Sequence, residues 1–92
     1  MEPWTEAQVE RVLEWYEKDP GDALVGEEVL RGVGLTELRA LFGVPADDAE
    51  DPDLLLPYEV EPSDVPTLQR AVSHRIDLDA YDYFVAAYRK ER

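Results

Sequence analysis

A turn signal near the N-terminus limits how the first third of the chain can fold. The tetrapeptide Asp-Pro-Gly-Asp at residues 19–22 combines residue types that favour tight turns. Residues 23–30, on its far side, form a short run that is compatible with a β-strand. A strand needs a partner, and the nearest candidate is the segment before the turn. The sequence therefore predicts a β-hairpin in which Val9–Glu17 pairs with Ala23–Leu30.

A helix is the alternative structure for the segment before the turn. Thr5 and Gln8 have the spacing of a capping box, and apolar residues recur with the helical period at Val9, Val12, Leu13 and Tyr16. Glutamates at positions 6, 10 and 14 oppose this helix because they place like charges one turn apart. The hairpin is preferred, with Trp4–Ala7 as a short lead-in turn. In a hairpin either Trp15 or Tyr16 must face away from the core.

Three short helices are predicted after the hairpin. The first covers Leu35–Gly43, with Thr36 as its N-cap and Gly43 at its C-terminal end. The second begins at Ser63 and runs to about Val72. The third begins at Asp79 and continues to the C-terminus, with a helical stripe of Tyr81, Phe84, Val85 and Tyr88.

Two further features complete the prediction. Residues 44–53 form an acidic loop, and a short edge strand is expected around Tyr58–Val60. The expected fold class is α+β, an N-terminal β-hairpin packed on about three short α-helices within one small acidic domain spanning residues 1–92. An all-α fold is the alternative.

Three segments together resemble a known family. They are Leu24–Glu28, Leu35–Gly43 and Ile76–Phe84, and the block Tyr81-Asp82-Tyr83-Phe84 is the most specific part. Across about residues 9–90 the chain resembles a family of small, acidic, uncharacterised bacterial proteins. The resemblance implies a hairpin at the start of the fold. It implies no activity, because none is established for that family.

The charge of the chain restricts the kinds of partner that it can bind. Its 22 acidic residues outnumber its nine basic residues and give a formal net charge of −13, and the excess lies in residues 1–62. Nucleic acid and anionic membranes both attract basic proteins, so neither is an expected partner. A protein with a basic surface is the expected partner, because opposite charge speeds association.

Other parts of the composition narrow the class of protein further. The hydrophobic fraction of 45% is typical of a folded domain, so the charge does not indicate disorder. Cysteine is absent, which excludes disulfides and thiol catalysis. No apolar run reaches the length of about 20 residues that a membrane helix needs. With no signal-peptide pattern at residues 1–8, a cytoplasmic location is expected.

Catalytic and metal-binding patterns are weak in this sequence. The acidic loop lacks the spacing of a calcium loop, which needs oxygen ligands at its first, third and fifth positions. If Asp47 is the first position, the third is Ala49, which has no side-chain oxygen. Ser73, His74 and Asp77 are close in sequence, but no nucleophile-elbow pattern surrounds Ser73. We therefore expect no enzymatic activity, no metal site and no cofactor.

A binding role is the remaining hypothesis. The chain is expected to be a protein-binding module of the inhibitor or immunity type that neutralises a basic partner. The alternatives are an accessory or regulatory subunit of a larger assembly and a DNA mimic. An exposed tyrosine is a favourable interface anchor. The predicted partner-binding residues are Asp47, Asp48, Glu50, Asp51 and Asp53 in the loop, Glu27 and Glu28 as support, and Tyr83 as an anchor.

Overall fold

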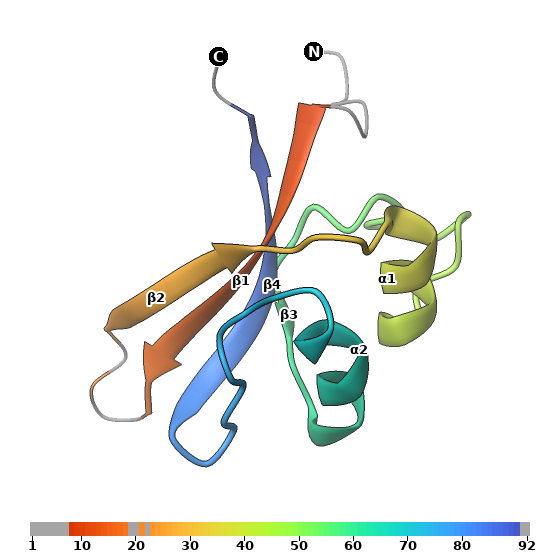
Figure 1. Ribbon diagram of the computed structural model, residues 1–92. Coiled ribbons are helices and arrows are strands. Elements are labelled where there is room, and N and C mark those ends of the chain that lie inside the picture. The colour runs from red at the N-terminus through yellow and green to blue at the C-terminus, as the bar shows by residue number, and fades with distance from the viewer. Residues whose placement is uncertain (1–7, 19–20, 22, 91–92) are drawn as a thin grey trace.

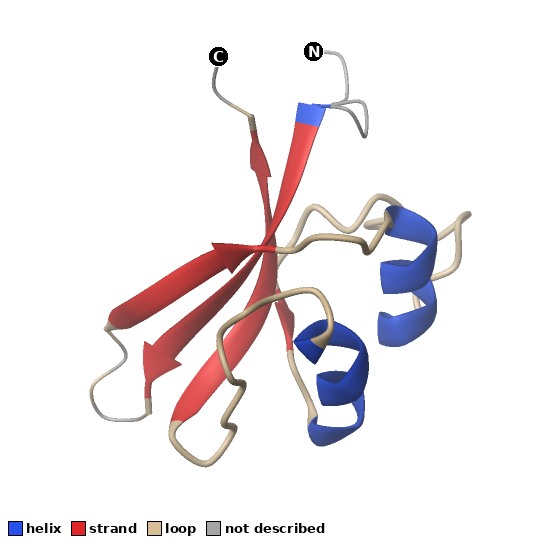
Figure 2. Ribbon diagram, in the orientation of Figure 1, coloured by secondary structure: helices blue, strands red, loops and turns tan. Residues whose placement is uncertain are grey.

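A four-stranded antiparallel sheet forms the centre of the protein. The computed structural model describes residues 8–18, 21 and 23–90 (Figure 1). The strands follow the order β2-β1-β4-β3. Among the described residues there are two short α-helices, and the fold is mostly sheet (Figure 2). The elements are β1 (Val9–Glu17), β2 (Leu24–Val29), α1 (Leu35–Phe42), β3 (Tyr58–Glu59), a 3-10 turn (Pro62–Asp64), α2 (Val65–Gln69) and β4 (Tyr81–Arg89).

The N-terminal hairpin forms where the turn signal indicates it. β1 pairs with β2 in an antiparallel ladder, with an irregularity between Trp15 and Tyr16. Beside the turn, the N–H of Glu17 donates to the carbonyl of Ala23 at 2.8 Å. Positions 19, 20 and 22 of the turn lie outside the described residues, as do Thr5 of the proposed capping box and the proposed lead-in turn Trp4–Ala7.

The predicted fold class is wrong, because the closing segment is a strand and not a helix. β4 pairs with β1 over its full length, from Val9 opposite Arg89 to Glu17 opposite Tyr81. A strand at the centre of a sheet has apolar residues on both faces, and a run such as residues 83–87 then matches a buried helix as well as a strand. Neither three helices packed on a hairpin nor an all-α fold describes the chain.

The predicted start of the third helix is instead a turn that leads into β4. The carbonyl of Asp77 accepts hydrogen bonds from the N–H groups of Ala80 and Tyr81, both at 3.1 Å. The carboxylate of Asp77 accepts the N–H of Asp79 at 3.0 Å. Aspartate favours both helix N-caps and turns because its side chain bonds nearby backbone N–H groups. The aromatic residues that follow favour a strand.

The helix α1 forms close to the predicted position but has a different N-cap. Gly34, and not Thr36, is the N-cap, and its N–H donates to the Glu37 carboxylate at 2.7 Å. Gly43 ends the helix in a left-handed conformation with φ of 70°, which glycine adopts without a steric penalty.

The second predicted helix is real but shorter than expected. The predicted span of Ser63–Val72 contains the end of the 3-10 turn and α2, which ends at Gln69. The Gln69 amide bonds the carbonyl of His74 at 2.7 Å and the N–H of Ile76 at 2.9 Å, which fixes the connector that follows. Among the described residues, no helix is long and apolar enough to cross a membrane.

The sheet has two faces with different surroundings. The inner face carries Leu13, Trp15, Tyr83 and Val85, which share one core with the fully buried Leu38 of α1 and Leu68 of α2. Both helices lie on the same side of the sheet (Figure 1). By strand alternation and register, the opposite side, called the outer face, carries Glu10, Val12, Glu14, Tyr16, Leu24, Glu27, Val29, Asp82, Phe84, Ala86 and Tyr88.

Candidate functional site

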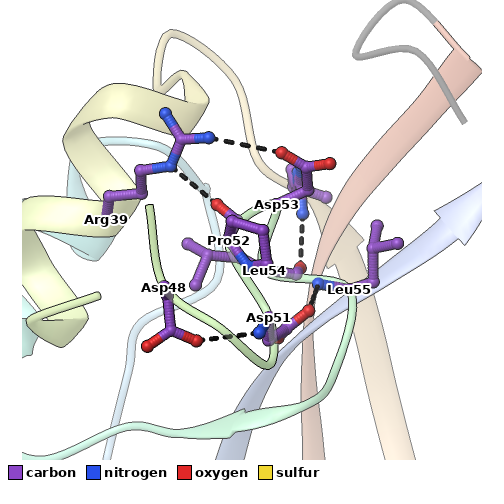
Figure 3. A network of polar contacts seen from close by, with 8 residues as sticks. Arg39, Asp48, Asp51, Pro52, Asp53, Leu54 and Leu55 are labelled. Carbon is purple, nitrogen blue, oxygen red and sulfur yellow. Dashed lines mark hydrogen bonds and ion pairs between the residues drawn. The ribbon is translucent and has the colours of Figure 1, made fainter. Parts of the chain in front are cut away.

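The acidic loop is held together by two of its own carboxylates. The carboxylate of Asp51, which is only 7% exposed, accepts the N–H groups of Leu55 at 2.8 Å and Leu56 at 3.1 Å. The Tyr58 hydroxyl donates to the same carboxylate at 2.7 Å. Asp48 accepts the N–H of Asp51 at 2.8 Å. Both carboxylates thus point toward backbone N–H groups of residues close in sequence (Figure 3). These two predicted partner-binding residues therefore stabilise the loop.

The contacts of Asp51 shift two pKa values in opposite directions. Burial on its own raises the pKa of Asp51, but the hydrogen bonds it accepts and the nearby Arg11 charge outweigh burial. The pKa of Asp51 is therefore lowered. Burial and the hydrogen bond to Asp51 raise the pKa of Tyr58 to about 12. The pair is thus a carboxylate and a neutral phenol across the neutral pH range.

Two arginines from the body of the fold hold the other end of the loop. Arg39 of α1 donates through Nε to the Pro52 carbonyl at 2.7 Å and pairs with Asp53 at 3.3 Å (Figure 3). Arg11 of β1 donates to the carbonyl of Leu54, which is buried and has a φ of 51°. A left-handed leucine is strained, so its surroundings must hold it in place.

The supporting glutamates differ in their surroundings. Glu28 accepts the N–H of Ser73 at 2.7 Å, the Ser73 hydroxyl at 2.9 Å and the N–H of His74 at 2.9 Å, which ties β2 to the connector before β4. The hydrogen bond from the Ser73 backbone is the main reason that the pKa of Glu28 is lowered. Glu27 lies on the outer face opposite Glu14 and is exposed. Asp47 and Glu50 are also exposed.

The prediction that Tyr83 is an exposed anchor is wrong, because its side chain is 1% exposed and belongs to the core. In a helix Tyr83 would point away from the apolar stripe, but in a strand it shares the inner face with Val85. Its hydroxyl accepts the N–H of Asp77 at 2.9 Å and lies 2.7 Å from His74 Nε2. Burial raises the pKa of Tyr83.

His74 completes an aromatic cluster on the inner face. Its ring stacks on Trp15 with the ring centres 3.8 Å apart. Trp15 is therefore the residue of the hairpin that faces the core, and Tyr16 faces outward. Ser73 is hydrogen bonded to Glu28 and His74 to Tyr83, so their side chains serve packing and loop contacts.

A cluster on the outer face was missed by the sequence analysis. Glu14 is 4% exposed, and its carboxylate accepts the hydroxyls of Tyr16 at 3.0 Å and of Tyr88. The ring of Phe84 packs edge-on against Tyr16, with the ring centres 5.8 Å apart. The hydrogen bond to Glu14 and burial raise the pKa of Tyr88 to about 12, and burial also raises the pKa of Tyr16.

Alternation in the hairpin carried a signal for this cluster. In a strand, the side chains at positions 10, 12, 14 and 16 lie on one face, and this set contains two glutamates and a tyrosine. The other half of the cluster comes from β4, where the sequence pattern predicts a helix, so the sequence alone does not bring the two halves together.

The outer face and the loop define the candidate site. No group of three or more histidine, aspartate or glutamate side chains is arranged to hold a metal ion in the described part of the chain.

Residues 10–86 match a domain of unknown function, DUF7683. The chain belongs to the DUF7683 family. A comparison with curated proteins found no match. The predicted membership in an uncharacterised family is thus confirmed, and the match spans all four strands in part or in full.

Proposed function

We propose that this member of the DUF7683 family is an acidic protein-binding module that neutralises a basic partner, as inhibitors and immunity proteins do. The observation that carries the proposal is the outer face, where Glu10, Glu27 and Asp82 surround aromatic side chains on an open sheet surface. Even if every lysine and arginine formed an ion pair, the formal charge of −13 would remain. This excess attracts a basic protein and accelerates association.

The aromatic content of the outer face favours a protein partner. Tyr88 is 46% exposed, and tyrosine contributes much contact area at low entropic cost in protein interfaces. The DNA-mimic alternative has less support, because carboxylates on the outer face alternate with apolar and aromatic side chains and do not form a continuous charged row.

The proposal is tested by capturing a partner from cells of the native host on the immobilised protein. The partner is expected to be basic, with an association rate that falls steeply as salt increases. Charge-removing variants then locate the interface: Glu10→Gln with Glu27→Gln on the outer face, and Asp47→Asn with Glu50→Gln on the loop. Residues Asp48, Asp51 and Asp53 are left unchanged because they hold the loop together. An acidic partner, or association that is insensitive to salt, contradicts the proposal.

An accessory subunit of a larger assembly is the second candidate function. The edge strand β2 exposes Leu24 and Val25, and Leu56, between the acidic loop and β3, is exposed as well. Exposed apolar side chains at a sheet edge favour permanent association. In this case the capture experiment would return several subunits together, and their binding would persist at high salt.

A further inference from the structure

The outer face contains two adjoining hollows, and we infer that the partner fills them with two different side chains. One hollow takes an apolar side chain, and the other takes an arginine. This inference rests on the proposed function, since it describes how the basic partner is recognised. It also identifies where on the acidic surface binding occurs.

The apolar hollow lies between β4 and the segment that precedes β3. It has a volume of about 520 Å³, and its lining includes Leu55, Pro57, Phe84 and Ala86. Asp82 also lines it, but this carboxylate already pairs with Lys18 at 2.9 Å. The apolar part of this lining suits a phenylalanine or leucine side chain, because burial of apolar surface against apolar walls is favourable.

The acidic hollow lies over β1 and β2. It has a volume of about 860 Å³, and it is lined by four glutamates and one arginine, Arg89. Glu28 is engaged with Ser73 and His74, and Glu14 with two tyrosines, so Glu10 and Glu27 are the carboxylates that face an incoming cation. The negative excess in this hollow is complementary to a basic side chain.

Tyr16, Glu14 and Tyr88 line both hollows and so lie at their common boundary. The two tyrosine hydroxyls bond the Glu14 carboxylate, which holds the rings in place. A guanidinium group suits this boundary better than an ammonium group, because it is planar, stacks on aromatic rings and bonds carboxylates through two N–H groups. This is the reason for assigning arginine and not lysine to the acidic hollow.

The spacing of the hollows follows from the sheet register. Glu27, Glu14 and Phe84 are successive partners across β2, β1 and β4. Neighbouring strands are about 4.8 Å apart, so Glu27 and Phe84 are separated by about 10 Å. On an α-helix, residues seven positions apart are separated by about 10.5 Å along the axis. A helix with an apolar residue and an arginine seven positions apart therefore spans both hollows.

The test uses defined peptides and isotope-labelled protein. The probe is a helical peptide of alanine and glutamine that carries one phenylalanine and one arginine seven positions apart. Replacement of its arginine by lysine or glutamine, or of its phenylalanine by alanine, gives three control peptides. We expect amide shifts in β1, β2 and β4, with binding of the arginine peptide about tenfold tighter than that of the glutamine peptide, as one desolvated charge contact supplies.

Three protein variants make the test specific. Glu27→Gln should weaken the arginine peptide about threefold to tenfold and leave the glutamine peptide unchanged. Leu55→Asn should weaken every peptide that carries phenylalanine. Asp79→Asn, in the exposed turn before β4 and outside the lining of both hollows, removes the same charge as Glu27→Gln and should have no effect. Circular dichroism of each variant shows whether its fold is retained.

Some outcomes would overturn this inference without affecting the proposed function. Equal binding of all four peptides, equal lysine and arginine affinities, or shifts centred on residues 47–53 would each exclude the two-hollow arrangement. So would a captured basic partner whose affinity is unchanged by Glu27→Gln combined with Leu55→Asn. An acidic captured partner would instead contradict the proposed function, while the peptide measurements would still report on the hollows.

Discussion

Single carboxylates in this protein have unequal roles, and Asp51 has the clearest structural one. It accepts two backbone N–H groups and the Tyr58 hydroxyl while almost fully buried. Asp51→Asn removes the charge and weakens these bonds. Hydrogen bonds to a charged acceptor contribute roughly 1–3 kcal/mol, so we expect unfolding free energy at pH 7 to fall by about that amount. Urea denaturation measures the change.

The pH dependence of Asp51 follows from the direction of its pKa shift. The folded-state pKa lies below the ordinary value of 3.8, so its stabilising contribution is present above that value. The contribution is lost as the pH falls through the lower, folded-state pKa. The Asp51→Asn protein should therefore differ most from the unmodified protein near pH 7 and converge with it in strong acid. Asp47→Asn, at an exposed position, serves as the control. An equal loss in both variants would contradict the assigned role of Asp51.

The pKa of Tyr88 depends on the Glu14 carboxylate. Its pKa of about 12 has the hydrogen bond to Glu14 as the largest cause. We expect Glu14→Gln to lower the pKa of Tyr88 toward its ordinary value of 10.0, because the amide carries no charge. Ultraviolet absorbance of tyrosinate follows the titration, and Tyr88→Phe identifies the step that belongs to Tyr88.

The same contact predicts how stability changes in alkali. Because the folded-state pKa of Tyr88 is raised, its contribution is fully present below the unfolded-state pKa and is lost as the pH rises through about 12. The unmodified protein should lose more stability than Tyr88→Phe across this window. Identical alkaline unfolding of the two proteins would show that the hydrogen bond has no influence on folding.

At the scale of elements, the packing of β2 against β1 depends on Gly26. This glycine pairs with Trp15, and a Cβ at position 26 would lie 2.5 Å from the indole ring. The indole cannot retreat easily, because His74 stacks on it at 3.8 Å. We expect Gly26→Ala to destabilise the protein by about 1–3 kcal/mol, the usual cost of overpacking.

Tryptophan fluorescence during urea unfolding measures the effect of Gly26→Ala. Val25→Ala on the exposed part of the same strand is the control, with an expected change within about 0.5 kcal/mol. Equal loss of stability in both variants would contradict a specific clash between the side chain at position 26 and the indole.

Elements with local signals could be predicted from the sequence, and those that depend on distant partners could not. The hairpin has a turn sequence between its two strands, and α1 is followed directly by Gly43, which ends it. β4 has no such local signal, because its partner β1 lies far away in the sequence and its apolar residues fit two periodicities. A helix in place of β4 directs Tyr83 outward, which explains the wrong anchor.

The candidate site was predictable only in part for the same reason. Acidic side chains at positions 27, 47 and 50 are exposed as expected. The side chains of Asp48 and Asp51 instead accept backbone N–H groups that would otherwise lack acceptors. A count of charged residues does not reveal such hydrogen bonds. The cluster around Glu14 could not be assembled without the pairing of β1 with β4.

At the scale of the whole molecule, the net charge of −13 acts on a small body with extents of 37 × 29 × 25 Å. At 0.01 M salt the screening length is about 30 Å, so carboxylates across the molecule repel one another, whereas at 0.15 M it is about 8 Å. We expect the melting temperature at pH 7 to rise by several degrees between these two conditions, because unfolding relieves the repulsion.

Calorimetry at constant pH measures the salt effect. Potassium chloride and sodium chloride should act alike if screening is the cause. A melting temperature that does not change, or falls, with added salt would mean that specific attractive pairs outweigh the general repulsion.

The pairing of β1 with β4 also determines when the protein can fold during its synthesis. The first and last strands of the sheet form its longest ladder, so the ribosome must complete β4 before the sheet can close. Until then β1 has only the short β2 as a partner, and such a hairpin is marginal on its own. Ribosome-bound chains stalled before residue 81 should thus be digested rapidly by protease, and chains extended past residue 90 by the length of the exit tunnel should resist it. The sheet can therefore close only after β4 has left the exit tunnel, which delays folding until late in the synthesis of this domain.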